Sequence, residues 1–333
     1  MVAIICVVLA FAAALVSTHL FIRFADSQGV KAHANERSMH RGATVTGGGL
    51  PLLVSALLAF LLCWPLLEIH AFLLPAAALL AVVSFLDDLK PVARWLRFGT
   101  HLIGAAAAVA IVPTDQFVFQ GWLPIWLDRA LALFLVVWFI NLFNFMDGID
   151  GIAGVETFFI CAGFLIVCAA AGSGSPLLGL ALALIGAVAG FLFWNWHPAR
   201  VFMGDVGSIP LGFLCAAMLI WLAANISLSA ALILPLYFVA DATITILKRL
   251  SRGEKIWEPH RSHFYQRSAV AVGSHAVVVR RVAVCNAVLI VLAVLALSLP
   301  VFAFVLAVMC VGGLLGWMQI ASGTNVAAEA GAS

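Results

Sequence analysis

Two adjacent aspartates close an apolar stretch of the chain, in the segment SFLDDLK at residues 84–90. Adjacent carboxylates repel each other, and this repulsion raises the pKa of one of them unless a cation compensates. A divalent metal, the nearby Lys90 or a role as a base would explain why Asp87 and Asp88 stand together. Ordinary solvation of a helix end is the competing explanation, and it weakens as further acids of this kind are found.

The segment NLFNFMDGIDGIAG at 141–154 carries an oxygen ligand at every third position, namely Asn144, Asp147 and Asp150. On a helical turn this spacing places the three side chains on one face. Hard oxygen donors with open positions suit Mg²⁺ or Mn²⁺, which keep water ligands and share phosphate oxygens. The glycines of the segment let a ligand approach backbone N–H groups that bind phosphate. The pattern predicts a site for a metal and a phosphate.

Asp205 lies in the segment NWHPARVFMGDVGS at 195–208, directly before another apolar run. Ser208 and Pro210 indicate that a helix starts there. A carboxylate on a glycine-flanked turn can hold a metal while the helix N-terminus beside it holds phosphate. Asp205 is therefore a second candidate for the same chemistry.

The segment EPHRSHFYQR at 258–267 sets histidines and arginines beside a carboxylate. His260, Arg261 and His263 favour the clamping of a phosphate group. A zinc site at His260 and His263 is disfavoured, since no cysteine or third histidine stands near them. The other basic residues of this loop are explained by membrane topology and by contact with anionic lipids.

Long apolar runs must position these segments. Of the 333 residues, 65% are hydrophobic and only 10% are charged, whereas about 25% of a soluble domain is charged. A spanning helix needs about 20 mainly apolar residues. We predict an all-α polytopic membrane bundle with about ten or eleven transmembrane helices, a single domain over 1–321 and a disordered cytoplasmic tail over 322–333. The apolar runs are 2–22, 50–69, 71–86, 98–113, 130–145, 151–171, 177–195, 209–224, 228–247, 282–299 and 301–321.

The basic residues predict the orientation of this bundle. With the N-terminus outside and the spans alternating, 16 of the 17 lysines and arginines fall in inside loops, and Arg129 falls outside. The C-terminus is then cytoplasmic, and the acids named above all face the cytoplasm. The net charge of +2 does not indicate a surface that binds nucleic acid.

Two further acids lie inside predicted spans, where an ionisable group costs roughly 3 kcal/mol at a helix centre. Asp241 lies in the run 228–247, about two turns before Lys248. We expect Asp241 to pair with a base or to line the pocket, with packing inside the bundle as an equal alternative. Glu156 presents the same choice.

Together these segments resemble the polyprenyl-phosphate N-acetylhexosamine-1-phosphate transferases of glycosyltransferase family 4. The family includes the initiating enzymes of O-antigen and teichoic acid synthesis and the phospho-N-acetylmuramoyl-pentapeptide transferases. The four segments occur in family order over nearly the whole chain, and NERSMHRGATVTGGGL at 35–50 is similar to the family's first cytoplasmic loop. In that loop, however, Ala43, Val45 and Thr46 stand where relatives often carry Pro, Pro and Arg. The form HRSHFYQ is more similar to O-antigen initiating enzymes that use UDP-N-acetylfucosamine or UDP-N-acetylquinovosamine.

The resemblance implies an enzyme that transfers an N-acetylhexosamine 1-phosphate from a UDP-sugar to polyprenyl (undecaprenyl) phosphate. The reaction would release UMP at the cytoplasmic face of a bacterial inner membrane and start a lipid-linked polysaccharide such as the O-antigen of lipopolysaccharide. The resemblance implies Mg²⁺, or Mn²⁺, held by Asp205 and Asn144, and polyprenyl phosphate received by Asp87 with or without Asp88. A homodimer in the lipid bilayer is compatible with it. The implied substrate-binding residues are Asp147, Asp150, Lys90, His260, Arg261 and His263.

Several alternatives stay open at this point. Direct attack by the lipid phosphate and a two-step path through an aspartyl-phosphate fit the same residues. A transporter also carries buried acids, but here the acids end helices on one side and no inverted repeat is visible. A CDP-alcohol phosphatidyltransferase is disfavoured, because Gly154 and Val155 replace the Ala-Arg that follows its first aspartates.

Overall fold

The computed structural model describes residues 1–27, 44–64, 68–255 and 260–330, and these residues form an all-α protein. Residues 35–43 of the predicted first cytoplasmic loop and Glu258 lie outside the described residues. Within the described part there are thirteen helices and one isolated β-bridge, so the predicted all-α class is confirmed. The helices are α1 (Val2–Ser27), α2 (Gly49–Cys63), α3 (Glu68–Leu89), α4 (Arg94–Ala110), α5 (Ile125–Met146), α6 (Ile152–Ala170), α7 (Leu178–Asn195), α8 (Asp205–Asn225), α9 (Leu228–Ile233), α10 (Leu236–Ser251), α11 (Phe264–Val272), α12 (His275–Leu295) and α13 (Pro300–Ala330).

Eight of the described helices are long and apolar enough to cross a membrane, namely α1, α3, α5, α6, α7, α8, α12 and α13. This number is smaller than the predicted ten or eleven because three predicted runs form shorter helices. The runs 50–69 and 98–113 correspond to α2 and α4, which have 15 and 17 residues. The run 228–247 is divided into α9 and α10 around Pro235, since proline has no N–H and clashes with the preceding turn. The polytopic membrane bundle itself is confirmed.

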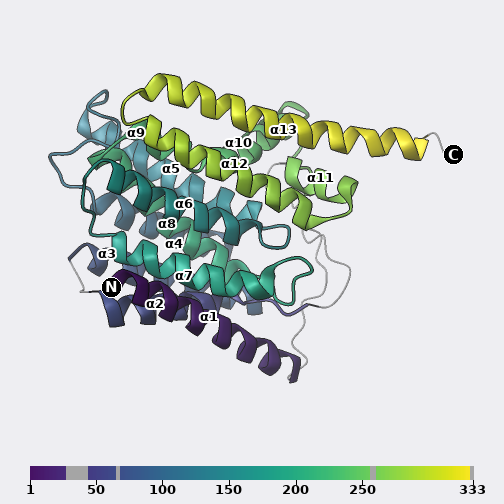
Figure 1. Cartoon of the computed structure of the whole chain (residues 1–333), viewed down its shortest axis with the longest axis horizontal. Coiled ribbons are helices and arrows are strands. Elements are labelled where there is room, and N and C mark those ends of the chain that lie inside the picture. Colours follow the sequence, from purple (N-terminus) through teal and green to yellow (C-terminus); the bar gives the residue numbers. More distant parts are fainter. Residues whose placement is uncertain (28–43, 65–67, 256–259, 331–333) are drawn as a thin grey trace.

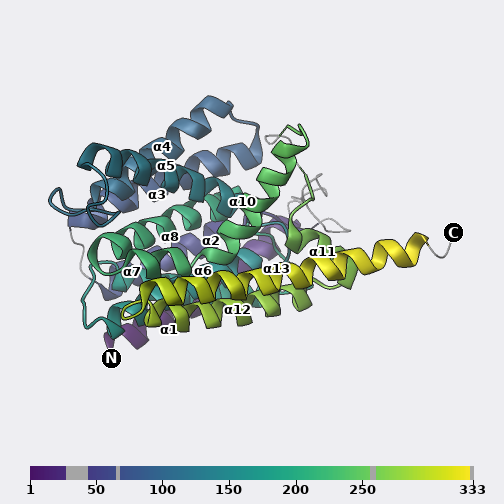
Figure 2. The same cartoon turned by 90° about the horizontal axis from the view of Figure 1, so that it is seen from above.

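The central helix of the bundle is α8. All residues of its apolar stretch are buried, whereas only 22% of the residues in the apolar stretch of α1 and 28% of those in α13 are buried. In both views α8 runs through the middle of the bundle, while α13 and α1 lie on its outside (Figures 1 and 2). Because Asp205 is the first residue of α8, the best-packed helix of the protein positions that carboxylate.

The two termini lie at opposite ends of the bundle (Figure 1), as an outside N-terminus and a cytoplasmic C-terminus would require. Which end faces the cytoplasm stays a prediction. Helix α13 extends to Ala330 and so takes in most of the residues 322–333 that we assigned to a tail. The boundary between the 1–321 domain and that tail also stays a prediction.

Two loops that carry predicted motifs are joined by backbone contacts. Val45 and Val201 form a parallel β-bridge, and the N–H groups of Gly48 and Gly49 donate to Phe202 and Met203 at 2.9 Å each. The approach is closest at Gly49, where an added Cβ would lie 2.2 Å from Cα of Gly207. The start of α2 is therefore locked onto the turn that carries Asp205.

Replacing Gly49 with alanine is expected to destabilise the protein by about 3 kcal/mol, because the clash is with backbone atoms that cannot rotate away. The midpoint of thermal unfolding in detergent should fall by several degrees. Gly99→Ala is the matched control, since an added Cβ at Gly99 meets nothing within 4 Å and alanine favours a helix. Equal midpoints for the two variants would contradict the proposed lock.

Candidate active site

Carboxylates from three separate segments gather beside the first turn of α8. The Val206 N–H donates to Asp88 Oδ2 across 3.2 Å, which ties the end of α3 to α8. Gly204 makes this approach possible, because its φ is +74° and an added Cβ would lie 3.0 Å from Asp88 Oδ2. The charges of Asp88 and Asp205 both act on the carboxyl group of Asp147, in the turn after α5. The structure thus brings together acids that sequence reasoning assigned to one site.

The surroundings of Asp147 raise the pKa of its carboxyl group. Burial, as the largest cause, and then the charges of Asp205, Asp150 and Asp88 together raise this pKa to about 7. Asp147 ends α5 as its C-terminal capping residue and is half-buried. A cluster of hard oxygen donors with excess negative charge fits a divalent cation such as Mg²⁺.

Asp87 is held differently from Asp88. Its Oδ2 pairs with Arg97 Nη1 at 2.7 Å, and its Oδ1 accepts the Val92 N–H at 2.7 Å. The other guanidinium nitrogen of Arg97 lies 3.8 Å from Asp205 Oδ2. Arg97 therefore bridges the end of α3 and the start of α8. Sequence reasoning used Arg97 only to assign topology, and no motif marked it as a site residue.

Asn144 lies against α8, as its predicted place beside Asp205 requires. The Ser208 hydroxyl donates to Asn144 Oδ1 across 2.7 Å. An amide oxygen has two lone pairs, so this bond orients Asn144 and leaves acceptor capacity for a second partner. Lys90 is exposed just past the end of α3.

Asp150 belongs to a second group, with two histidines that sequence reasoning did not select. Its Oδ2 lies 2.5 Å from His197 Nδ1 and 3.2 Å from His275 Nδ1, and it accepts the Ala199 N–H at 3.3 Å. The potential ligand atoms of these three side chains lie within 4.8 Å of one another. Two imidazole nitrogens with one carboxylate form a donor set for a transition metal such as zinc. His275 is 125 residues from Asp150 in the chain, so no local motif could have indicated it.

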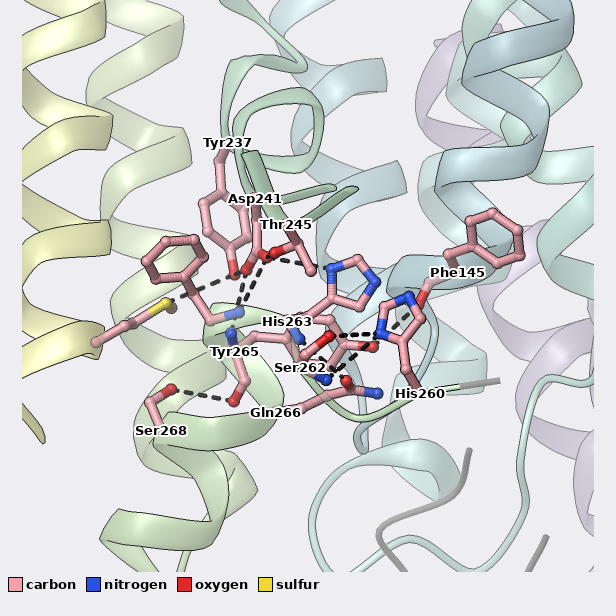
Figure 3. Close-up of polar contacts among 12 residues, drawn as sticks. Phe145, Tyr237, Asp241, Thr245, His260, Ser262, His263, Tyr265, Gln266 and Ser268 are labelled. Carbon is pink, nitrogen blue, oxygen red and sulfur yellow. Dashed lines mark hydrogen bonds and ion pairs between the residues drawn. The ribbon is translucent and has the colours of Figure 1, made fainter. Parts of the chain in front are cut away.

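The predicted histidine segment surrounds a buried aspartate (Figure 3). His263 is 1% exposed, and its Nδ1 lies 3.2 Å from Asp241 Oδ1. This contact confirms that Asp241 pairs with a base. His260 is half-buried beside the Ser262 hydroxyl, 2.8 Å from its Nδ1, and Arg261 is exposed.

Glu156 lies apart from these groups. It is fully buried in α6, where Asn286 Nδ2 of α12 donates to its Oε2 at 2.7 Å. Packing inside the bundle, the second alternative for this residue, is what the structure shows.

Comparison with known proteins identifies the family. A family model described as glycosyl transferase family 4 matches residues 70–223. Over 266 residues the chain is 30% identical to the phospho-N-acetylmuramoyl-pentapeptide-transferase of Heliobacterium modesticaldum, covering 73% of this chain and 81% of that protein. The chain belongs to glycosyl transferase family 4. A second relative in this family is the probable undecaprenyl-phosphate N-acetylglucosaminyl 1-phosphate transferase of Bacillus subtilis (strain 168), 27% identical over 76% of this chain and 73% of that protein.

Membership of glycosyl transferase family 4 confirms the resemblance found in the motifs. The matched range 70–223 contains the acids from Asp87 to Asp205. The histidine segment lies beyond that range, so the family match does not extend to His260, Arg261 or His263.

Proposed function

We propose that this protein transfers an N-acetylhexosamine 1-phosphate from a UDP-sugar to polyprenyl phosphate and releases UMP. The observation that carries the proposal is the convergence of Asp88, Asp147 and Asp205 from α3, the turn after α5 and α8. Both relatives are named as transferases of a phosphorylated sugar unit, and one name specifies undecaprenyl phosphate as the acceptor. Such an enzyme needs a place where two phosphate-bearing substrates meet, and an acid cluster that binds a cation provides it.

Asp205, Asp147 and Asn144 would hold Mg²⁺, with Mn²⁺ as a substitute. Their oxygen atoms and the surplus of negative charge favour such a cation over a softer metal. When bound, the cation would offset the charge of the diphosphate and so favour attack by a second anion.

The chain's own groups have separate tasks in this reaction. An oxygen of the polyprenyl phosphate attacks the β-phosphorus, the bond from that phosphorus to UMP breaks, and UMP leaves with the bonding electrons. The second pKa of a phosphate monoester is about 6, so the attacking group is already largely a dianion and needs no strong base. Asp87 and Asp88 would orient the acceptor phosphate, with Arg97 fixed beside it by Asp87. A path through an aspartyl-phosphate remains the alternative chemistry.

The remaining predicted contacts surround this centre. Asp150 would orient the nucleotide or the sugar, supported by His197 and His275. Lys90, His260 and Arg261 would neutralise the diphosphate. The burial of His263 favours an indirect contribution from that residue.

The proposed setting is a bacterial inner membrane, with the site open to the cytoplasm, where UDP-sugars are found. The lipid acceptor would reach the site from the bilayer. The product would start a cell-surface polysaccharide such as O-antigen. The form of the histidine segment supports an O-antigen donor, UDP-N-acetylfucosamine or UDP-N-acetylquinovosamine.

The test is Mg²⁺-dependent release of UMP by the purified protein. A panel of UDP-N-acetylhexosamines is offered, each with and without polyprenyl phosphate. Release that requires both the lipid and one particular sugar is the expected result. If folded protein released no UMP with any sugar yet moved a solute across vesicles, the transporter alternative would replace this proposal.

A further inference from the structure

A single buried carboxylate organises the segment from His260 to Ser268. Asp241 in α10 is 0% exposed. Its Oδ1 accepts the Phe264 N–H at 3.0 Å and its Oδ2 accepts the Tyr265 N–H at 3.1 Å. His263 Nδ1 lies 3.2 Å from Oδ1, so the same carboxylate contacts both the imidazole and the backbone of this segment (Figure 3).

These contacts make Asp241 the cap of a helix that is distant in sequence. The first N–H groups of a helix have no partner within the helix, and they carry partial positive charge. His263 is the N-terminal capping residue of α11, yet the carboxylate that accepts the next two N–H groups comes from α10. Without Asp241, these buried N–H groups would have to find other acceptors, so the start of α11 is fixed relative to α10.

The same carboxylate determines the tautomer of His263. An ionised carboxylate accepts hydrogen bonds and donates none, so the His263 nitrogen that faces it must carry the proton. This contact therefore favours the tautomer with the proton on Nδ1, which leaves Nε2 for another partner. The ring of His263 also stacks on the ring of His260, with centroids 4.9 Å apart and planes 27° apart. Fixing His263 in this way also constrains His260.

Helix α11 in turn contacts the turn that carries Asp147. The Tyr265 hydroxyl donates to the Phe145 carbonyl oxygen at 3.1 Å. At Gly148, an added Cβ would lie 2.2 Å from the Tyr265 hydroxyl and 2.9 Å from Gln266 Nε2. The segment held by Asp241 is thus packed directly against the candidate metal-binding turn.

We propose that Asp241 is a positioning residue of the active site, which fixes the tautomer of His263 and seats α11 against the Asp147 turn. This inference rests on the proposed function, because it assigns Asp241 a part in that reaction. Asp241 acts through His263, Phe264 and Tyr265 and does not itself touch the substrate.

The first experiment compares Asp241→Asn with Thr245→Val. Thr245 also donates to Asp241 Oδ1, at 3.3 Å, but holds neither His263 nor α11. We expect Asp241→Asn to lower kcat for UMP release about 10- to 100-fold, with a smaller change in KM, and Thr245→Val to stay near the wild type. If Asp241→Asn lowered only the yield of folded protein and left kcat per folded molecule unchanged, Asp241 would be a structural cap alone.

The second measurement does not depend on catalysis. Selective ¹⁵N labelling of histidine rings, assigned through His263→Gln, reports which nitrogen of His263 carries its proton. The wild type is expected to show an Nδ1–H tautomer that is lost in Asp241→Asn. An Nε2–H tautomer in the wild type would overturn the proposal even if the Asp241 variant failed to fold.

Tyr265→Phe tests the contact with the Asp147 turn while its backbone N–H still binds Asp241. We expect a several-fold increase in the Mg²⁺ concentration needed for half-maximal activity, and an unchanged Mg²⁺ requirement would contradict the seating of α11. Absence of UMP release by the wild type would instead reject the proposed function. The tautomer of His263 would still be measurable in that case, so the two failures are distinguishable.

Discussion

Replacing Asp205 with asparagine is expected to lower kcat for UMP release about a hundred- to a thousand-fold, the range seen when one preorganised charge-stabilising group is removed. The substitution keeps the shape of the side chain and removes its charge. Asp205 is the first residue of α8, the most buried of the candidate membrane-spanning helices. Because α8 is tightly packed, no neighbouring side chain can easily move to replace its carboxylate. The loss should be greatest at limiting Mg²⁺ and should shrink only partly as Mg²⁺ is raised.

The matched control is Asp115→Asn. Asp115 is an exposed aspartate in the loop between α4 and α5, so its substitution changes the net charge by the same amount outside the site. UMP release is measured for both variants over a range of Mg²⁺ concentrations, and the control should follow the wild type. Near-normal turnover of Asp205→Asn at limiting Mg²⁺ would refute the assignment of Asp205 as a metal ligand.

The sequence was sufficient to predict where the acids gather. Asp87, Asp147 and Asp205 each end or begin an apolar run, and runs that cross one bilayer must place such ends in a common plane. The identity of the partners within that plane could not be predicted in the same way. Whether Asp87 or Asp88 faces α8 depends on the rotation of α3 about its axis, and the structure turns Asp87 toward Arg97 and Asp88 toward Val206.

Contacts between segments distant in the chain were the hardest to predict. His275 joins Asp150 across 125 residues, and its own surroundings in the sequence contain no metal-binding pattern. Asp241 was noticeable because a carboxylate in an apolar run needs a partner. Its actual partners are backbone N–H groups as well as a histidine, and backbone groups leave no signature in a sequence.

The number of spans depends on which of the shorter helices cross the membrane. Apolar composition alone does not distinguish a helix that crosses the membrane from a short helix that fills a gap in the bundle. Helix α4 shows how a run and a helix can differ in their bounds, because the predicted run is 98–113 whereas the helix begins in a basic segment at Arg94 and ends at Ala110. The division of the run 228–247 into two helices at Pro235 could have been predicted, since proline disfavours the interior of a helix.

Binding of Mg²⁺ is expected to weaken as the pH falls below about 7, with Asp147 as the cause. Burial and the neighbouring carboxylates raise the pKa of Asp147 from 3.8 to about 7 when no cation is bound. Below that pH a proton occupies the carboxyl group and the metal must displace it. In Asp147→Asn this pH dependence should become weaker, because Asp88 and Asp205 remain in the cluster, and binding should be weaker throughout.

The same shift predicts a change in stability of opposite sign. The folded protein holds the Asp147 proton more tightly than the unfolded chain, so between about pH 4 and pH 7 the folded state binds more protons. Stability contributed by this group therefore decreases as the pH rises through that window, and the ionised carboxylate remains a cost above pH 7. Metal-free wild type should accordingly lose more thermal stability from about pH 5 to about pH 7 than Asp147→Asn, and added Mg²⁺ should reverse the loss in the wild type.

Both effects can be measured without substrate, which matters because the acceptor phosphate itself titrates at about pH 6. Binding of Mn²⁺, followed by its electron paramagnetic resonance signal, gives the affinity at each pH, and thermal unfolding gives the stability. Asp115→Asn should reproduce the wild type in both measurements. If Asp147→Asn kept the full pH dependence of Mn²⁺ binding, Asp147 would not be the titrating group. The charges of Asp88, Asp150 and Asp205 would then not raise its pKa in the way proposed, and another carboxylate of the cluster would be responsible.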